Sequence, residues 1–459
     1  MSVTNPLLEK NKSQLGNTEI TMFSLGFAAI SFINLGFGTY LSYFWSDIAL
    51  IPLAAMGSIF VISRFLDGGT DIVIGFLVDR TNTKYGKARP WLLWMALPGL
   101  LSMAALFYVP NFSETGRIAW AFITYNMVAF FTLTAITLPL QSLTVLMTND
   151  PKKRLTLNMV GQSFGTAATV IGNLYVLKAI ESLGGGADGY FKFFAMLAVV
   201  ATAMILVTFA GTKERVDRPV GKKVEKITAK VALKSFVANK WWVLVTLLQL
   251  LTMTYPALMA INMYYMTWVM KNPALMGPFM SAIFVSLLLT LIVFTPLVPR
   301  VGKINAGFIG MFFQIVGGIM PLFAPGNTSV MMVSGVFRGI GPAMLLGTRL
   351  AFMCDVVEYG EWKTGIRIEG LVFSGASMGA KIGTGLGAAV VAMMLARGGY
   401  VGGALTQTAE ALSSITITFT WLHALSSALV TACLFTLRGL EKQMPQIMAD
   451  LEARKAKTV

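Results

Sequence analysis

Histidine and cysteine are almost missing from this chain of 459 residues, which contains only His423, Cys354 and Cys433. A structural zinc site needs four Cys or His ligands, so the chain cannot build one, and it has no disulfide framework. Charge is scarce as well. Charged residues make up 12% of the chain, hydrophobic residues make up 55%, and the mean hydropathy is +0.69. This composition excludes a soluble enzyme of this size and indicates an integral membrane protein.

The N-terminal region lacks the marks of a removable signal peptide. Residues 1–19 are polar, contain Glu9, Lys10 and Lys12, and hold no short apolar region that ends at a small-residue cleavage site. After them, apolar runs of about 20 residues, the length that crosses a bilayer as a helix, recur along the chain. We count twelve such runs. The sequence therefore predicts an all-α membrane protein with twelve transmembrane helices.

The longest polar segment, residues 212–240, divides the twelve runs into two groups of six. We expect a cytoplasmic leader at 1–19, six-helix bundles at 20–211 and 241–436 with the linker between them, and a cytoplasmic tail at 437–459. Two six-helix halves are the layout of the major facilitator superfamily of transporters, in which the substrate binds between the halves near the middle of the membrane. The pattern predicts that fold.

The net charge of +15 does not require a nucleic-acid partner, because the basic residues sort by side of the membrane. The segments that we assign to the inside hold 27 Lys and Arg, and those assigned to the outside hold 4. We therefore expect a multi-pass protein of the inner (plasma) membrane with both termini in the cytoplasm. Its partners would be the lipid bilayer and a small-molecule substrate, and we expect a monomer.

Three charges occur within the second predicted helix, in the stretch "SRFLDGGTD". Arg64, Asp67 and Asp71 lie at relative positions 0, 3 and 7, so they project from one face of a helix. Each charge at the middle of a bilayer costs about 2.5 to 3.5 kcal/mol, so this face must meet protein or water. The three charges sum to −1, which one Na⁺ or one proton would neutralise. We interpret the face as a site for a coupling cation, with no other cofactor.

Two other interpretations of this face are open. Arg64 and one aspartate could form a structural ion pair, although that leaves the second carboxylate unexplained. Alternatively, two aspartates four residues apart could hold Mg²⁺ and a diphosphate in an intramembrane prenyltransferase. That enzyme would need a second carboxylate cluster, and the sequence has no second pair at the middle of a helix.

Further charges gather where the second and tenth predicted helices reach the cytoplasm. We interpret them as ion pairs between the two halves that close an inner gate and break when it opens. The residues are Asp79, Arg89, Asp355, Glu358, Glu361 and Arg367.

Two basic residues within later helices are candidates for the central cavity. Lys381 lies about a dozen residues from either end of the eleventh helix, too far for its side chain to reach the membrane surface comfortably. Arg349 shares a face of the tenth helix with Arg338. The glycines around Lys381, in "GASMGAKIGTGLGAA", predict close helix packing rather than a nucleotide-binding loop.

The stretches "FLDGGTDIVIGFLVDRTNTKYGKARPW" and "DVVEYGEWKTGIRIEGLVFS" resemble the two hallmark stretches of the glycoside-pentoside-hexuronide:cation symporter family, the family of the melibiose permease. The resemblance runs nearly end to end. It implies secondary transport of a sugar or glycoside rather than enzymatic activity. It also implies that Asp67 and Asp71 bind the cation, that Thr134 completes this site and that Lys381 lies near it. Asp355 and Arg367 match the inner-gate network.

The chain departs from the melibiose permease pattern at the sugar site. Ser31 and Thr137 stand where that permease has two sugar-binding aspartates, Gln141 replaces a tryptophan, and Thr70 replaces an asparagine of the cation site. Losing the carboxylates removes repulsion of anions, so the solute could carry an acidic group, as a hexuronide does. A lysolipid or another amphiphile is the alternative solute. The predicted substrate contacts are Thr137, Gln141, Lys381, Arg349, Ser31 and Tyr40.

Overall fold

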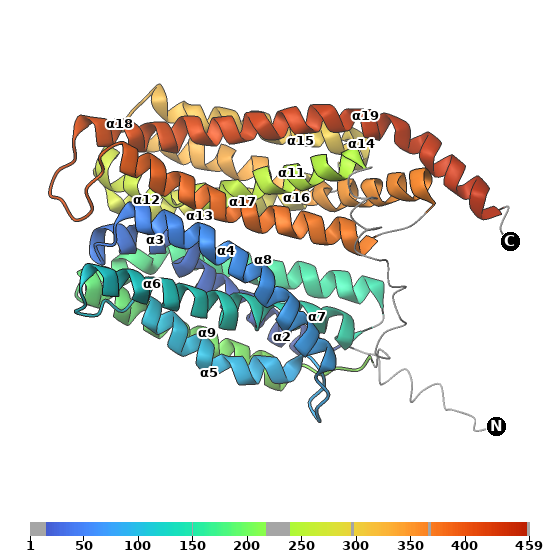
Figure 1. Ribbon diagram of the computed structural model, residues 1–459, viewed down its shortest axis with the longest axis horizontal. Helices are drawn as coiled ribbons and strands as arrows, with labels where there is room; N and C mark the ends of the chain where they lie inside the picture. The colour runs from blue at the N-terminus through green and yellow to red at the C-terminus, as the bar shows by residue number, and fades with distance from the viewer. Residues whose placement is uncertain (1–14, 149, 217–238, 295–297, 366–368, 457–459) are drawn as a thin grey trace. The chain divides into compact units, whose positions relative to one another are not determined.

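The structure, a computed structural model, describes residues 15–148, 150–216, 239–294, 298–365 and 369–456. The described ranges contain helices, turns and one isolated bridge between Thr83 and Gly86, and no strand. The chain forms two compact units, unit 1 from Met1 to Lys222 and unit 2 from Lys223 to Val459. Figure 1 shows the helices of each unit running side by side as a bundle.

Unit 1 contains six long helical segments, some of which are interrupted by π-helical turns. In chain order its elements are α2 (Asn17–Asn34), η1 (Leu35–Tyr40), α3 (Leu41–Tyr43), η2 (Phe44–Ile48), α4 (Leu53–Arg80), α5 (Arg89–Leu106), α6 (Glu114–Val128), η3 (Ala129–Thr134), α7 (Thr137–Met147), α8 (Pro151–Ser182) and α9 (Gly186–Gly211).

Unit 2 is likewise built from long helices and short π-helical or 3-10 turns. Its elements are α11 (Lys240–Leu258), α12 (Ile261–Tyr264), η4 (Tyr265–Val269), η5 (Pro273–Leu275), α13 (Met276–Phe294), α14 (Val298–Val301), α15 (Lys303–Ile319), η7 (Met320–Leu322), α16 (Thr328–Thr364), α17 (Glu369–Arg397), α18 (Ala409–Ile417), η8 (Thr418–Leu422) and α19 (His423–Ala456).

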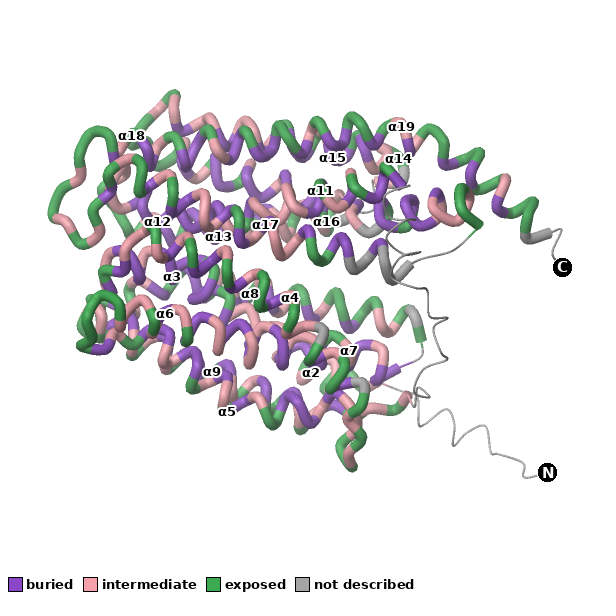
Figure 2. Tube along the Cα trace, in the orientation of Figure 1, coloured by how far each residue is buried: buried purple, intermediate pink, exposed green. Residues whose placement is uncertain are grey.

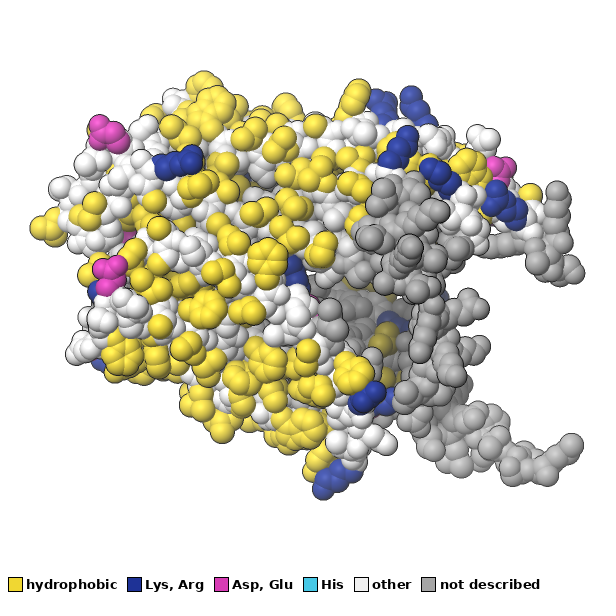
Figure 3. All heavy atoms as spheres, in the orientation of Figure 1, with side chains coloured by type: hydrophobic (Ala, Val, Ile, Leu, Met, Phe, Trp, Pro, Cys, Tyr) yellow, Lys and Arg dark blue, Asp and Glu magenta, His cyan; other side chains and the backbone are white. Residues whose placement is uncertain are grey.

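Nine helical segments of the described chain are long and apolar enough to cross a membrane. The helices α4, α5 and α8 are the other long ones, and with them the segments match the twelve predicted from the sequence. In the space-filling view, hydrophobic side chains cover much of the visible face over the helices of each unit (Figure 3). The predicted all-α membrane fold is confirmed.

Buried and exposed positions alternate along the helices with helical spacing (Figure 2). In α9, Tyr190, Phe194 and Ala198 are buried, whereas Met196 and Val199 are exposed. One face of such a helix packs on protein while the other is apolar and open, as suits a helix that meets lipid. The buried face is aromatic, and the ring of Phe194 stacks on that of Phe107 with centroids 3.9 Å apart.

Glycines on α17 allow it to pack closely on α11, as the sequence predicts. A Cβ added to Gly379 would lie 2.6 Å from the carbonyl oxygen of Thr246, and one added to Gly387 would lie 2.7 Å from that of Thr254. No side chain fits at such distances, so the two backbones are in direct contact. Without a hydrophobic driving force between helices in lipid, this close approach supplies the packing energy.

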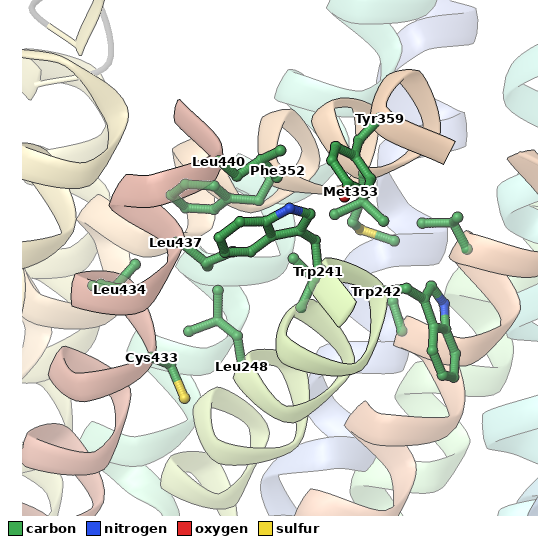
Figure 4. Close-up of a cluster of buried hydrophobic side chains, with 14 of the residues drawn as sticks. Trp241, Trp242, Leu248, Phe352, Met353, Tyr359, Cys433, Leu434, Leu437 and Leu440 are labelled. Atoms are coloured by element: carbon green, nitrogen blue, oxygen red, sulfur yellow. The ribbon is translucent and has the colours of Figure 1, made fainter. Parts of the chain in front are cut away.

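Most of the predicted tail, 437–459, belongs to α19, which extends to Ala456. Its apolar face, which includes Leu440 and Ile447, belongs to a cluster of buried side chains centred on Trp241 of α11. Figure 4 shows the Trp241 indole next to Phe352 and Leu440. Residues 1–14 of the predicted leader and 217–238 of the predicted linker lie outside the described residues.

Candidate cation and substrate site

Arg64, Asp67 and Asp71 lie on α4, and the first two form an ion pair. Nη1 of Arg64 donates to Oδ2 of Asp67 at 2.9 Å, and 7% of Asp67 is exposed. The spacing of three residues brings the two side chains together on one face of the helix. This pair is the structural ion pair that one interpretation of the sequence proposes. The ion pair explains the carboxylate of Asp67 but not that of Asp71.

Two side-chain hydrogen bonds fasten this part of α4 to α6. Nη2 of Arg64 donates to the hydroxyl of Tyr125 at 2.6 Å, and Nδ2 of Asn126 donates to Oγ of Ser63 at 3.0 Å. The Tyr125 ring is itself buried among aromatic side chains, and it stacks on Phe37 with centroids 4.4 Å apart. The charged face of α4 is therefore held at a defined rotation about the helix axis.

Asp71 meets Thr134, as the family resemblance implies. Oγ1 of Thr134 donates to Oδ1 of Asp71 at 3.1 Å, and Thr134 is buried. Thr134 is the last residue of η3, a π-helical turn that follows α6. A π-helical turn widens the helix and is frequent at functional sites. Here it carries the threonine that contacts the second carboxylate.

This face presents oxygen atoms, and cation binding at it stays a prediction. The carboxylates of Asp67 and Asp71 and the hydroxyl of Thr134 come from two neighbouring segments, and hard cations prefer such oxygens. Thr70, also predicted for the cation site, makes a local hydrogen bond instead: its hydroxyl donates to the backbone carbonyl of Asp67 at 3.0 Å. Within the described residues, no group of three or more His, Cys, Asp or Glu side chains is placed to hold a metal ion.

The predicted substrate contacts in unit 1 differ in exposure. Gln141 of α7 is exposed, and Thr137, at the start of the same helix, is half-buried, as is Ser31 of α2. Tyr40 has no exposed surface, and its hydroxyl donates to Oδ1 of Asn173 at 3.3 Å. Gln141 therefore lies at the surface of unit 1, whereas Tyr40 contributes to its interior packing.

Unit 2 contains the other two predicted contacts. Lys381 is half-buried on α17, and Arg349 is half-buried on α16 and lines a cavity of unit 2. Three turns before Arg349, Arg338 is completely enclosed. Its guanidinium donates to the backbone carbonyls of Gly317, Gly318 and Phe419 at 3.2, 3.3 and 2.9 Å.

Two of the predicted gate residues, Arg89 and Asp355, have partners within their own units. Arg89 donates to the carbonyl oxygen of Phe209 at 2.7 Å, and Asp355 pairs with Lys303 of α15. Glu358 and Glu361 are half-buried on α16. The side chain of Asp79, and Arg367 as a whole, lie outside the described residues. Pairing between the halves stays a prediction.

Sequence reasoning missed Tyr125 as the partner of Arg64 and Lys303 as the partner of Asp355. It also missed Glu214, whose carboxylate accepts the backbone N–H groups of Lys87, Ala88 and Arg89 at 2.8, 2.8 and 3.0 Å. These hydrogen bonds provide acceptors for the backbone N–H groups at the start of α5, which have no acceptor within the helix. The partners are separated by 52 to 127 residues in the chain. No local pattern marks such contacts.

The chain is similar to known transporters over most of its length. The family described as MFS/sugar transport protein matches residues 22–438. The isoprimeverose transporter of Lactiplantibacillus pentosus is 32% identical over 435 residues, which cover 92% of this chain and 89% of that protein. The inner membrane symporter YicJ of Escherichia coli is 29% identical over 407 residues, which cover 88% of this chain and 87% of that protein.

Solved structures show the same fold at low sequence identity. A crystal structure of a mutant of the nucleoside transporter NupG matches with a TM-score of 0.67 at 14% identity, over 91% of this chain and all of that chain. A match at this identity supports the fold alone. The family assignment rests on the sequence match, and it makes the prenyltransferase interpretation wrong, because the match identifies a transporter and not an enzyme. The chain belongs to the MFS/sugar transport protein family.

Proposed function

We propose that this protein is a symporter that uses a gradient of Na⁺ or H⁺ to accumulate a sugar or glycoside in the cell by alternating access. The observation that carries the proposal is the face of α4, where Asp71 accepts the hydroxyl of Thr134 and Asp67 is paired with Arg64. The names of similar proteins, the isoprimeverose transporter and the symporter YicJ, support the same class of activity.

Charge explains why such a face responds to a cation. Arg64, Asp67 and Asp71 sum to −1, and a net charge inside a membrane protein is costly. A bound Na⁺ or proton brings the sum to zero. The cation is then the ligand that lowers the free energy of the state in which this face is closed off from water. Coupling follows when the solute also favours that closed state.

The solute would bind residues of both units. Thr137, Gln141 and Ser31 of unit 1 are neutral groups that can exchange hydrogen bonds with sugar hydroxyls, and Lys381 and Arg349 of unit 2 add positive charge. The charged residues at the cytoplasmic ends of α4 and α16 would form the inner gate, with both termini in the cytoplasm. This layout follows the general mechanism of transporters built from two similar halves.

The test is uptake by proteoliposomes that contain the purified protein. With an inward gradient of Na⁺ or H⁺, the wild-type protein should concentrate one member of a panel of radiolabelled neutral and acidic glycosides. Asp71→Asn should abolish concentration while exchange of labelled for unlabelled solute continues, because the solute contacts are intact. An Asp71→Asn protein that concentrates the solute as well as wild type would refute the cation site.

The matched control is Asp188→Asn, which removes an exposed carboxylate from the first turn of α9. This variant should concentrate the solute like wild type. Repeating the assay with each gradient alone identifies the coupling cation, because only the cation that binds at Asp71 can drive accumulation.

A further inference from the structure

Unit 2 contains a cavity of about 160 Å³, lined mainly by α11, α15, α16 and α19. Pro256 of α11 and Pro342 of α16 both line it. Proline inside a helix clashes with the carbonyl four residues earlier and bends the helix. At Pro342 this freed carbonyl is that of Arg338, and the hydroxyl of Tyr255 donates to it at 2.9 Å. Two of the helices that line the cavity therefore each carry a proline beside it.

The walls of the cavity are mostly apolar. They include Leu248, Leu251, Met311, Leu345, Phe352 and Val430. Two of these side chains, Leu248 and Phe352, can be followed in Figure 4, where they also belong to the buried cluster around Trp241. A sugar ring placed against such walls would leave its hydroxyls without partners. The cavity therefore suits a ligand whose body is apolar.

One charged side chain meets this apolar space. Among the lining residues, all of which the structure describes, Arg349 is the only charged one, and none is Asp or Glu. The contact recorded for its guanidinium is the sulfur of Met253 at 4.0 Å, and a thioether is a weak acceptor. An arginine carries five N–H donors in a planar fork that matches a carboxylate. Its donors are available to an anion in the cavity.

A neutral amide adds to this polar end. Gln314 of α15 lines the same cavity and is buried, and within the described part of the chain the structure records no hydrogen bond for its side chain. Buried amides normally have partners, because losing their hydration is costly. The cavity thus combines a cation and an amide with apolar walls. Its size is close to that of apolar cavities of about 150 Å³ that bind benzene.

We propose that this cavity is a binding site for an organic monoanion with a small apolar body, of the class of aromatic carboxylates, whose carboxylate pairs with Arg349 and accepts from the Gln314 amide. The site lies within unit 2 and needs no residue of the α4 cation site. It shares Arg349 with the solute contacts proposed above and goes beyond them by naming a ligand class, whose binding can be measured without cation-driven accumulation.

The test is isothermal titration calorimetry of the purified full-length protein in detergent with benzoate, and with benzamide as the neutral analogue of the same shape. Benzoate should bind with a stoichiometry of one, and at least ten times more tightly than benzamide. Arg349→Gln should weaken benzoate binding about 10- to 150-fold, the range expected for losing a charged hydrogen bond. Arg349→Lys should restore part of the loss, because it returns the charge without the fork.

Two controls separate this site from other effects. Arg397→Gln removes an exposed arginine from the end of α17 and should leave benzoate binding unchanged. Asp71→Asn should also bind benzoate like wild type, even though we expect it to lose cation-driven accumulation. A thermal unfolding curve for Arg349→Gln that matches wild type shows that the variant is folded. The proposal is overturned by an absence of benzoate binding, by equal affinity for benzamide, or by wild-type affinity in a folded Arg349→Gln protein.

Discussion

Each unit has an arginine within a membrane helix, and the two units accommodate that charge in opposite ways. Arg64 of α4 pairs with the carboxylate of Asp67 and the hydroxyl of Tyr125. Arg338 of α16 donates instead to three backbone carbonyls, and its guanidinium lies over the ring of Phe419 at 4.0 Å from the centroid. One charge is neutralised by an acid, whereas the other is only solvated by dipoles and an aromatic face.

The carbonyls around Arg338 are available because regular helical bonding is interrupted there. Gly317 and Gly318 lie in the last turn of α15, where carbonyls have no partner in the helix. Phe419 belongs to the π-helical turn η8. Arg338 therefore joins α15, α16 and η8 as a structural cross-link. The partners of Arg338 thus explain its charge as structural, whereas Arg349 lines a cavity.

The two units also differ in the net charge of these membrane-helix residues. The charged face of α4 in unit 1 sums to −1 and suits a cation. The helices around the cavity of unit 2 present Arg338 and Arg349 without a lining carboxylate, and they suit an anion.

Removing the acid of the ion pair in unit 1 should have the largest effect on stability. Asp67→Asn leaves Arg64 without its carboxylate, and an unpaired buried charge costs about 3 to 5 kcal/mol. Thermal unfolding in detergent should show a strong loss. The double variant Arg64→Gln with Asp67→Asn should recover most of it, because both charges are gone. A double variant that is less stable than Asp67→Asn would contradict this interpretation of the pair.

The arginine of unit 2 should contribute less. Arg338→Met keeps the apolar length of the side chain but leaves the carbonyls of Gly317, Gly318 and Phe419 without their donor. We expect a loss of about 1.5 to 3 kcal/mol, the value of hydrogen bonds to charged groups. Chemical denaturation of Arg397→Met gives the baseline, since exposed positions contribute within about 0.5 kcal/mol. Equal stability of the two variants would show that Arg338 is not a cross-link.

Removing the Thr134 hydroxyl, which donates to Asp71, should weaken cation binding and leave the free energy of unfolding nearly unchanged. Thr134→Val keeps the shape of the side chain but removes the hydrogen bond to the carboxylate. Groups that support a cation ligand are worth about 10- to 100-fold in affinity. The cation concentration that gives half of the maximal thermal shift should rise by that factor, and Thr134→Ser should stay near wild type. No change in Thr134→Val would exclude Thr134 from the cation site.

Breaking an exposed ion pair should have the smallest effect on stability. Arg215, just after α9, pairs with Glu19 of α2 at 2.7 Å, and this hydrogen bond raises the pKa of the Arg215 guanidinium above its ordinary value. Surface pairs contribute about 0.2 to 1 kcal/mol and are screened by salt. Arg215→Ala should lower the midpoint of thermal unfolding slightly at low ionic strength and hardly at all in 1 M salt. A loss as large as that of Asp67→Asn would remove the distinction between exposed and buried pairs.

The fold and one part of the site could be predicted because their signals are local. Twelve apolar runs and a polar break between the sixth and the seventh indicate the helices, since a bilayer demands about 20 apolar residues for each crossing. The spacing of Arg64, Asp67 and Asp71 places them on one face because the helical repeat is fixed. The glycines of α17 indicate close packing in the same way. Each inference uses residues a few positions apart.

The partners of these residues could not be predicted in the same way. Tyr125 and Thr134 reach α4 from 61 and 63 residues away, and nothing in the local sequence distinguishes them from other polar side chains in the same helices. Thr134 was expected only through a family resemblance. Tyr40 is a case in which the sequence prediction and the structure differ. The sequence predicts that Tyr40 contacts the substrate, but neighbouring side chains enclose it in the structure.

By itself, the sequence determined which segments enter the membrane and which charges enter with them, because hydration costs and the helical repeat act over short stretches of chain. Only the tertiary structure decided which charges are satisfied. It gave Arg64 a carboxylate, gave Arg338 three carbonyls, and placed Arg349 at a cavity that is also lined by two helix prolines. The reason is that the free energy of a buried charge depends on the groups within a few ångströms, and packing brings those groups from distant parts of the chain.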